Sequence, residues 1–142
     1  MTTGSKTTVT IQTIINCPVE EAWKKWTSPD YVMRWNAASD DWHCPRAENN
    51  LTVGGKFSYR MEAKDGSAGF DFWGIYTVIV PHELIEFTLG DNRIVKIEFS
   101  EQKGATRIIE SFEVEDVNSL ELQRNGWQAI LDNFKKIAEN VN

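Results

Sequence analysis

The sequence predicts an α+β fold in which a curved antiparallel sheet is covered by one long C-terminal helix. Apolar and polar residues alternate with a period of two from Trp42 to Glu115, and this stretch is interrupted by turn-forming sequences. Near Asn118 the apolar period changes to 3.6 and continues almost to the end. A block of strands followed by a helix, without strand–helix alternation, is typical of the α+β class.

The residues before Trp42 are predicted to form a strand and two short helices. Residues 7–15 alternate well enough for a strand. Pro18 suits the first position of a helix, and the acidic pair that follows it favours the positive helix start. A second short helix is predicted to begin with Ser28 as its cap and Pro29 behind it.

About six further strands are expected between Trp42 and Glu115, with turns at VGG, KDGSAG, VPHE, GDN and QKG. Gly74 lies inside one of these strands, which indicates a bulge or a close approach of the chain. Asn118 and Glu121 resemble a capping box at the start of the last helix. We expect a single domain over residues 1–142, with residues 1–6 poorly ordered.

Composition and charge exclude several classes of function. A net charge of −6 argues against a nucleic-acid or anionic-membrane partner, because phosphate binding requires clustered Lys and Arg. No apolar run reaches the roughly 18 residues of a membrane helix, and the polar start MTTGSKTT is not a signal peptide. Two cysteines form no disulfide framework, so we expect a reduced, cytoplasmic setting.

The aromatic content indicates an internal cavity. Six tryptophans are more large rings than a domain of 142 residues needs to close its core. Rigid rings on a curved sheet can leave a gap into which smaller residues would collapse, and such a gap suits a small apolar ligand. Taken singly, each ring is better interpreted as ordinary core than as a ligand contact, because buried aromatic rings mostly pack.

Several sequence blocks together resemble a known family. In chain order they are CPVEEAWKKWTSPDYVMRW, VGGKF, FWGIYTVIVPHELIEFT, GATRIIESF and NGWQAILDNFKK. They resemble the activator-of-heat-shock-ATPase-like branch of the START and Bet v 1-like helix-grip superfamily (SRPBCC), and WNAASDDWHCPRAENN resembles a bacterial single-domain subgroup of that branch. The resemblance implies a hydrophobic cavity between the sheet and the C-terminal helix, used in the superfamily for lipids, sterols and polyketides. Chaperone activation belongs to two-domain members, so we expect no chaperone partner here.

Glu110 is the most unusual residue of the predicted sheet. Alternation places it on the same face as Ile108 and Phe112, which should point inward. An apolar environment raises the pKa of a carboxyl group unless a cation or several donors meet it. The candidate partners are Tyr59, His43, Gln123, Arg124 and the indole N–H of Trp127. Glu110 could anchor a ligand or act as a general acid or base; alternatively, a bulge returns it to solvent or Arg124 pairs with it.

The segment DDWHCPRAE contains candidate metal ligands and a candidate nucleophile. Two His and two Cys in the chain, without metal-ligand spacing, do not support a metal. His43 and Cys44 are adjacent, and adjacent residues of an extended segment point to opposite sides, which does not suit a Cys–His pair. We expect Trp35, Trp42 and His43 to form the mouth of the cavity, and His82 to be a surface residue.

These inferences combine into one predicted ligand-binding set without metal or cofactor. Its members are Trp35, Trp42, His43, Phe57, Tyr59, Met61, Phe72, Tyr76, Phe87, Ile97, Phe99, Glu110, Gln123 and Trp127. Gly126 costs about 1 kcal/mol relative to Ala in a helix interior, which a close helix–sheet approach or room for a ligand could offset.

Three functions follow from this set. The first is a binding protein for a small hydrophobic molecule, and this is our prediction. The second is a cyclase, dehydratase or hydrolase that uses Glu110, with help from His43 or Tyr59. The third is a chaperone-activator type of interaction module. Trp73, with Ile75 and Ile109 on the convex face, is a candidate homodimer patch.

Overall fold

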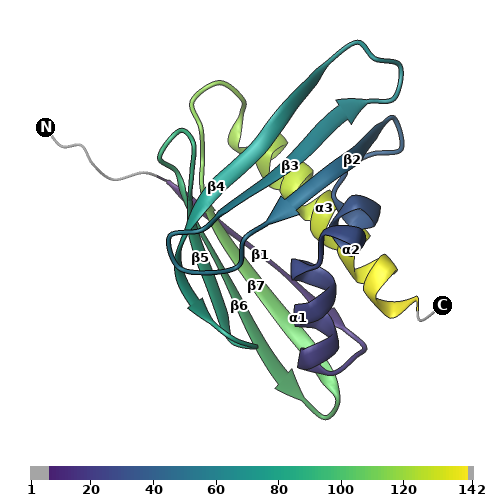
Figure 1. Cartoon of the computed structure of the whole chain (residues 1–142), viewed down its shortest axis with the longest axis vertical. Helices are drawn as coiled ribbons and strands as arrows, with labels where there is room; N and C mark the ends of the chain where they lie inside the picture. The colour runs from purple at the N-terminus through teal and green to yellow at the C-terminus, as the bar shows by residue number, and fades with distance from the viewer. Residues whose placement is uncertain (1–6, 141–142) are drawn as a thin grey trace, which may run out of the picture.

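The computed structural model describes residues 7–140 and confirms the predicted order of elements (Figure 1). The elements are β1 (Thr8–Ile15), α1 (Val19–Thr27), α2 (Pro29–Trp35), β2 (Trp42–Asn49), β3 (Lys56–Ala63), β4 (Gly69–Val80), β5 (Leu84–Leu89), β6 (Ile94–Gln102), β7 (Ala105–Glu113) and α3 (Leu120–Glu139). The expectation for residues 1–6 lies outside the described residues.

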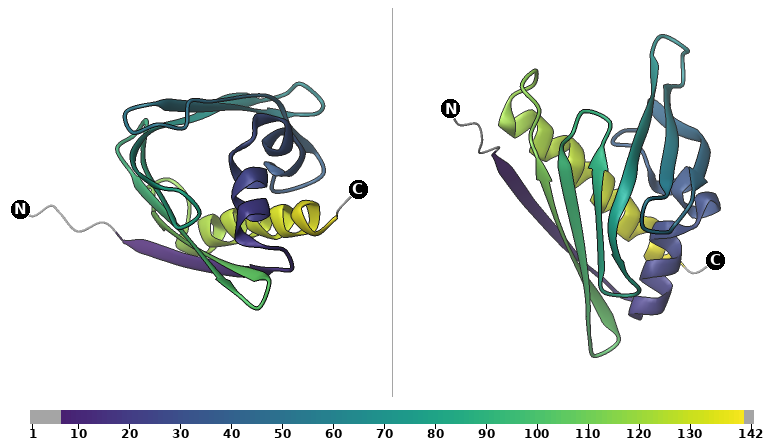
Figure 2. Two further views of the ribbon diagram at one scale, coloured as in Figure 1. Left: turned by 60° about the horizontal axis from the view of Figure 1, so that its bottom comes forward. Right: turned by 60° about the vertical axis from the view of Figure 1, so that its left-hand side comes forward.

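The seven strands form one antiparallel sheet in the order β1-β7-β6-β5-β4-β3-β2. Consecutive hairpins build β2 to β7, and β1 adds to the far edge beside β7. The sheet curls strongly, so that β2, β3 and β4 lie across the interior from α3 (Figure 2). The observed fold is therefore the predicted helix-grip α+β arrangement.

Helix α3 is attached along one edge of the sheet and to the two short helices. It runs along β1, where Lys135 Nζ donates a hydrogen bond to the Ile14 carbonyl. Asn133 Nδ2 donates to the Trp35 carbonyl (2.8 Å), and the buried Lys25 donates to the Ala138 carbonyl (3.0 Å). These bonds fix the C-terminal half of the helix against α1 and α2.

The helix starts differ from prediction at two places. Ser119, not Asn118, is the N-cap of α3, and its hydroxyl accepts a hydrogen bond from the Leu122 N–H (3.1 Å). Asn118 is instead bound into the preceding loop by the Glu115 carboxylate. Pro18 is the N-cap of α1 and not its first helical residue, so α1 begins one residue later than predicted. In α2, Ser28 is the N-cap and Pro29 the first helical residue, as predicted.

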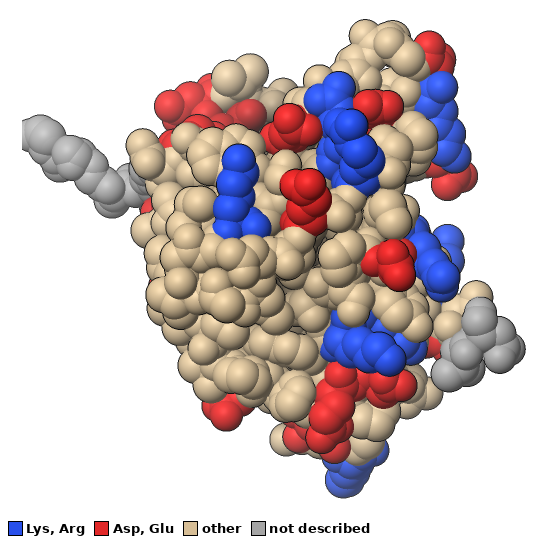
Figure 3. Space-filling model, in the orientation of Figure 1, with Lys and Arg blue, Asp and Glu red and all other residues tan. Residues whose placement is uncertain are grey.

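The outer surface carries both signs of charge. On the face shown in Figure 3, Lys and Arg are interspersed with Asp and Glu. On the convex side Trp73 is 37% exposed, with Lys56 Nζ 4.8 Å above its ring and the backbone of Gly90 close beside it. Within residues 7–140, no helix is long and apolar enough to cross a membrane.

Gly74 marks a close approach inside the sheet, as predicted. A Cβ atom there would lie 2.8 Å from Phe57 Cε2 and 2.8 Å from the Thr88 carbonyl oxygen. The register irregularity of β4 occurs slightly later, between Tyr76 and Val78. The missing side chain of Gly74 therefore lets the Phe57 ring lie directly against the backbone of β4.

Replacement of Gly74 by Ala is expected to lower the free energy of unfolding by roughly 1–3 kcal/mol, because the backbone carbonyl of Thr88 cannot move away cheaply. Gly126→Ala is the matched control, since a Cβ there meets no atom within 4 Å. It should raise the stability by up to about 1 kcal/mol through helix propensity. Urea denaturation measures the free energy of unfolding of both variants. Equal changes in the two variants would contradict this account of Gly74.

Candidate functional site

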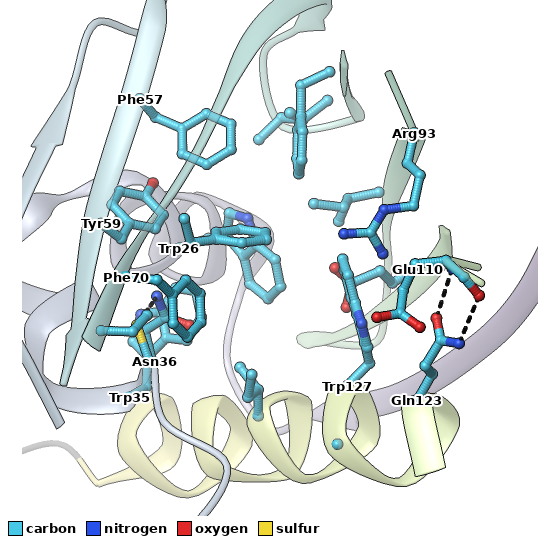
Figure 4. A pocket seen from close by; sticks show the side chains of 18 of the residues that line it. Trp26, Trp35, Asn36, Phe57, Tyr59, Phe70, Arg93, Glu110, Gln123 and Trp127 are labelled. Carbon is cyan, nitrogen blue, oxygen red and sulfur yellow. Dashed lines mark hydrogen bonds between the residues drawn. The ribbon is translucent and has the colours of Figure 1, made fainter. Parts of the chain in front are cut away.

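A cavity of about 330 Å³ lies between the concave face of the sheet and α3 (Figure 4). Side chains from α1, α2, α3 and five strands line it. Aromatic rings form most of the wall: Trp26, Trp35, Phe57, Tyr59, Phe70, Phe72, Tyr76, Phe87 and Trp127. The lining of this cavity is thus predominantly apolar and aromatic.

The wall does not collapse because its rings hold one another in place. The fully buried Phe57 lies at the centre of the sheet side, with its ring centroid 4.7–5.7 Å from four other rings. Those rings are Tyr59, Phe72, Tyr76 and Phe87. Such edge-on and tilted contacts stabilise rings beyond their buried area, so a turn into the cavity would cost several contacts at once.

Two aromatic stacks border the cavity along α3. Trp127 lies flat on Phe112 of β7, with centroids 4.1 Å apart and planes at 8°. At the other end Trp26 stacks on Trp35 at 4.8 Å, and Phe134 meets both with its edge. The helix therefore rests on rings at two points, and the cavity lies between them.

A hydrogen-bonded chain occupies the sheet side of the cavity. The Tyr76 hydroxyl donates to Asn49 Oδ1 (2.6 Å), and Asn49 Nδ2 donates to the Thr27 carbonyl (2.7 Å). The hydroxyl of Tyr59 interacts with that of Tyr76. Burial raises the pKa of Tyr59 well above its usual value and that of Tyr76 to about 12, so both are neutral phenols at physiological pH.

Glu110 faces the cavity from β7, as the alternation predicts. It pairs regularly with Ile11 of β1 and Ile97 of β6, so the alternative of a bulge is wrong. Its side chain is buried, with 6% of the residue exposed, and its carboxyl oxygens contact the cavity space. Burial raises the pKa of this carboxyl from 4.5 to about 8, and no charged group offsets the effect.

None of the candidate partners is hydrogen-bonded to Glu110. The amide of Gln123 turns away from it: Oε1 accepts from the Glu115 N–H (2.9 Å), and Nε2 donates to the carbonyls of Glu115 (3.1 Å) and Asn118 (2.9 Å) (Figure 4). Arg124 is exposed, so the alternative of an internal ion pair is also wrong. Trp127 lies beside Glu110 and contributes its ring rather than a hydrogen bond.

The rim of the cavity combines exposed apolar side chains with one cation. Phe70 is 51% and Leu122 58% exposed, although both line the cavity. Arg93, in the turn before β6, points its guanidinium toward the space while its Nε donates to Asp91 (2.8 Å). Gly126 leaves open space on the helix side, in agreement with the suggestion of room for a ligand.

Three residues of the predicted set lie elsewhere. Phe99 packs edge-on against Trp23 (5.2 Å) and Trp26 (6.1 Å) and belongs to the core below the cavity. Trp42 and His43 line a separate, polar hollow between α2, β2 and α3, because β2 packs against α2 rather than facing the cavity. The structure thus places neither at the cavity mouth. The other members line the cavity: Trp35, Phe57, Tyr59, Met61, Phe72, Tyr76, Phe87, Ile97, Glu110, Gln123 and Trp127.

The sequence reasoning left several lining residues out of the set. They are Trp26, Asn36, Phe70, Ile85, Arg93, Glu115, Asn118, Leu122, Gly126 and Ile130. Trp26 carried a usable signal, since it stands one helical turn after Trp23 on the apolar stripe of α1. Arg93 and Asn118 lie in turns, where no periodicity predicts direction. Within the part of the chain that the structure describes, no group of three or more His, Cys, Asp or Glu residues could hold a metal ion.

The curled sheet, the paired short helices and the long C-terminal helix around a cavity define a helix-grip, Bet v 1-like domain. More particularly, residues 16–139 match the model of the family described as "Activator of Hsp90 ATPase homolog 1-like protein", and the chain belongs to that family.

Solved structures agree with this assignment. The AHSA1-like protein from Aeromonas hydrophila is 41% identical, with a TM-score of 0.88 over 94% of this chain and 92% of the other. Chr148 from Cytophaga hutchinsonii is 45% identical, with a TM-score of 0.81 over 96% and 94%. CV1439 from Chromobacterium violaceum is 20% identical with a TM-score of 0.84 over 94% and 98%, which shows the fold alone. No curated protein matches the chain.

The raised pKa of Glu110 predicts a pH-dependent stability. At a pH between the ordinary pKa of 4.5 and the folded-state pKa of about 8, Glu110 is ionised in the unfolded chain and neutral in the folded chain. Each pH unit in that window should therefore cost the folded state up to about 1.4 kcal/mol, with no further change outside it.

Glu110→Gln should remove this cost, so the variant gains stability over the wild type as the pH rises from about 5 to about 8. Urea denaturation at three pH values across this window measures the difference. Glu98→Gln, the same change on the exposed face of β6, should run parallel to the wild type. If the stability of Glu110→Gln also changed with pH as that of the wild type does, Glu110 would ionise at its ordinary pKa, which would contradict the prediction.

Proposed function

We propose that this protein binds a small, predominantly apolar and aromatic molecule in the cavity between the sheet and α3. The observation that carries the proposal is the volume of about 330 Å³ enclosed by aromatic rings that brace one another. Sites for small molecules typically measure about 300–1,000 Å³ and combine apolar walls with a few polar groups. The ligand would therefore be small, on the scale of two or three fused rings.

An enzymatic role is the weaker interpretation. A carboxyl group with a pKa of about 8 is suited to proton transfer near neutrality. However, within residues 7–140 no second group is hydrogen-bonded to Glu110 as an orienting or relaying partner. The two cavity tyrosines are neutral and engaged with each other and with Asn49. We therefore propose ligand binding rather than catalysis. We propose no chaperone partner, because the feature that supports the proposal is a cavity inside the domain and not an exposed surface.

The neutral dye N-phenyl-1-naphthylamine is a suitable first probe, because its fluorescence rises in apolar surroundings and it accepts energy from tryptophan. We expect one dye per chain and energy transfer from the tryptophans of the wall. Native mass spectrometry of the gently purified protein would reveal a ligand already bound. No dye binding to the wild type would contradict the proposal.

Gly126→Leu locates the dye within the molecule. A Cβ at Gly126 meets no atom within 4 Å, so a leucine there should fill part of the cavity without straining the fold. We expect the dye affinity to fall at least about tenfold, because even a methylene-sized change in the fit of a hydrophobic pocket is worth about 1–3 kcal/mol. Asn125→Leu, on the exposed side of α3, is the matched control and should bind as the wild type does. Equal binding by both variants would place the dye outside the cavity.

A further inference from the structure

Among residues 7–140, Glu110 differs from the other carboxylate, amide, hydroxyl and guanidinium groups of the cavity in having no hydrogen-bond partner. Within residues 7–140 each of the others is engaged: Tyr59 and Tyr76 with each other, Gln123 with three backbone groups, Asn36 with Met61 Sδ (3.3 Å), Arg93 with Asp91 and Glu115 with the backbone N–H groups of Val117 and Asn118. Of these groups, only the Glu110 carboxyl contacts the cavity space without a hydrogen bond. A molecule that fills the cavity has to supply a partner to this carboxyl, because a polar group left unsatisfied on burial costs about 1–3 kcal/mol.

The surroundings of Glu110 favour its neutral form. Its neighbours on the adjacent strands are Ile11 and Ile97, and Trp127 covers it from α3. The cation of the rim, Arg93, is held by Asp91, and its charge does not offset the effect of burial on the pKa of Glu110. A carboxylic acid kept neutral in this way presents an O–H donor to the cavity.

On the basis of the proposed binding function, we propose that the natural ligand carries a carbonyl oxygen, and that neutral Glu110 donates a hydrogen bond to it. The ligand class is then a small aromatic ketone or a related carbonyl compound. Its carbonyl would lie at the Glu110–Trp127 end of the cavity, and its apolar body would extend toward Phe57 and Trp26 on the opposite side (Figure 4).

An organic cation fits the same space less well. A cation would have to lose its hydration in the aromatic cavity and remove the proton from Glu110, and both steps cost free energy. It would also pass the Arg93 guanidinium at the rim. A neutral acceptor meets neither obstacle.

The other titratable groups of the cavity keep one charge state across the range that matters. Tyr59 and Tyr76 stay neutral because burial raises their pKa. Glu115 stays ionised because the Asn118 N–H lowers the pKa of its carboxyl. Arg93 remains a cation, as arginine does in proteins. A pH effect on ligand preference between about pH 6 and 10 therefore reports on Glu110.

The pair 9-fluorenone and fluorene tests the proposal, because the two probes have the same ring system and differ in a carbonyl versus a methylene group. Tryptophan quenching gives both dissociation constants, and their ratio cancels effects common to both probes. At about pH 6 we expect fluorenone to bind about tenfold more tightly than fluorene, the value of one hydrogen bond. Above about pH 8 this preference should disappear, since the donor proton is lost. The carbonyl stretching band of bound fluorenone should move to lower frequency at pH 6.

Two substitutions separate the hydrogen bond from packing. Glu110→Gln retains an N–H donor that does not titrate, so the preference for fluorenone should persist and become independent of pH. Glu110→Leu removes the donor, so the two probes should bind equally and the shift of the carbonyl band should vanish. Glu98→Gln, on the exposed face of β6, should behave as the wild type does.

The outcomes distinguish this inference from the proposed function. Equal binding of both probes by the wild type at every pH would overturn the carbonyl proposal and leave the binding function intact. A preference for fluorenone that grows above pH 8 would overturn it as well, because the carboxylate would then be the binding form. Failure of both probes to bind would overturn the proposed function itself. If Glu110→Leu does not fold, the pH dependence of the wild type against that of Glu110→Gln decides the question.

Discussion

The cavity exists because α3 is held away from the centre of the sheet by two aromatic stacks. Trp127 on Phe112 supports one end of the helix, and Trp26 with Trp35 and Phe134 supports the other. Hydrogen bonds between α3 and each of β1, α1 and α2 fix the helix in this position. The sheet cannot close over the gap, because its own inner face is braced around Phe57.

The chemistry of Glu110 follows from this arrangement. The same β7 alternation that buries Ile108 and Phe112 also directs Glu110 inward, and Trp127 closes it off from the helix side. Gln123, the nearest amide on α3, is used to fix the loop between β7 and α3 through Glu115 and Asn118. Among the described residues the carboxyl is therefore left without a hydrogen-bond partner, and it faces the cavity.

Much of this could be predicted from the sequence where one periodicity governs direction. Strict alternation placed Phe57, Tyr59 and Glu110 on the concave face, and all three line the cavity. Direction could not be predicted where a contact distant in sequence decides it. Trp42 and His43 lie on an edge strand whose register shifts after His43 and which packs on α2, so they face another hollow.

Polar side chains were the least predictable part of the site. The direction of the Gln123 amide depends on backbone groups of a loop, and periodicity carries no information about them. Arg93 reaches the cavity from a turn, where neither helical nor strand spacing applies. The apolar shell of the cavity is thus encoded in local pattern, whereas its polar groups depend on the assembled fold.

The most direct test of this account is a carbon-13 NMR titration of the Glu110 side-chain carboxyl in the ligand-free protein, with Glu110→Gln used to assign its resonance. An unpaired carboxyl in an aromatic cavity predicts a midpoint of about 8. A midpoint close to the ordinary value of 4.5 would contradict the account, because the carboxyl would then be hydrated or paired and the cavity would not be the apolar space described above.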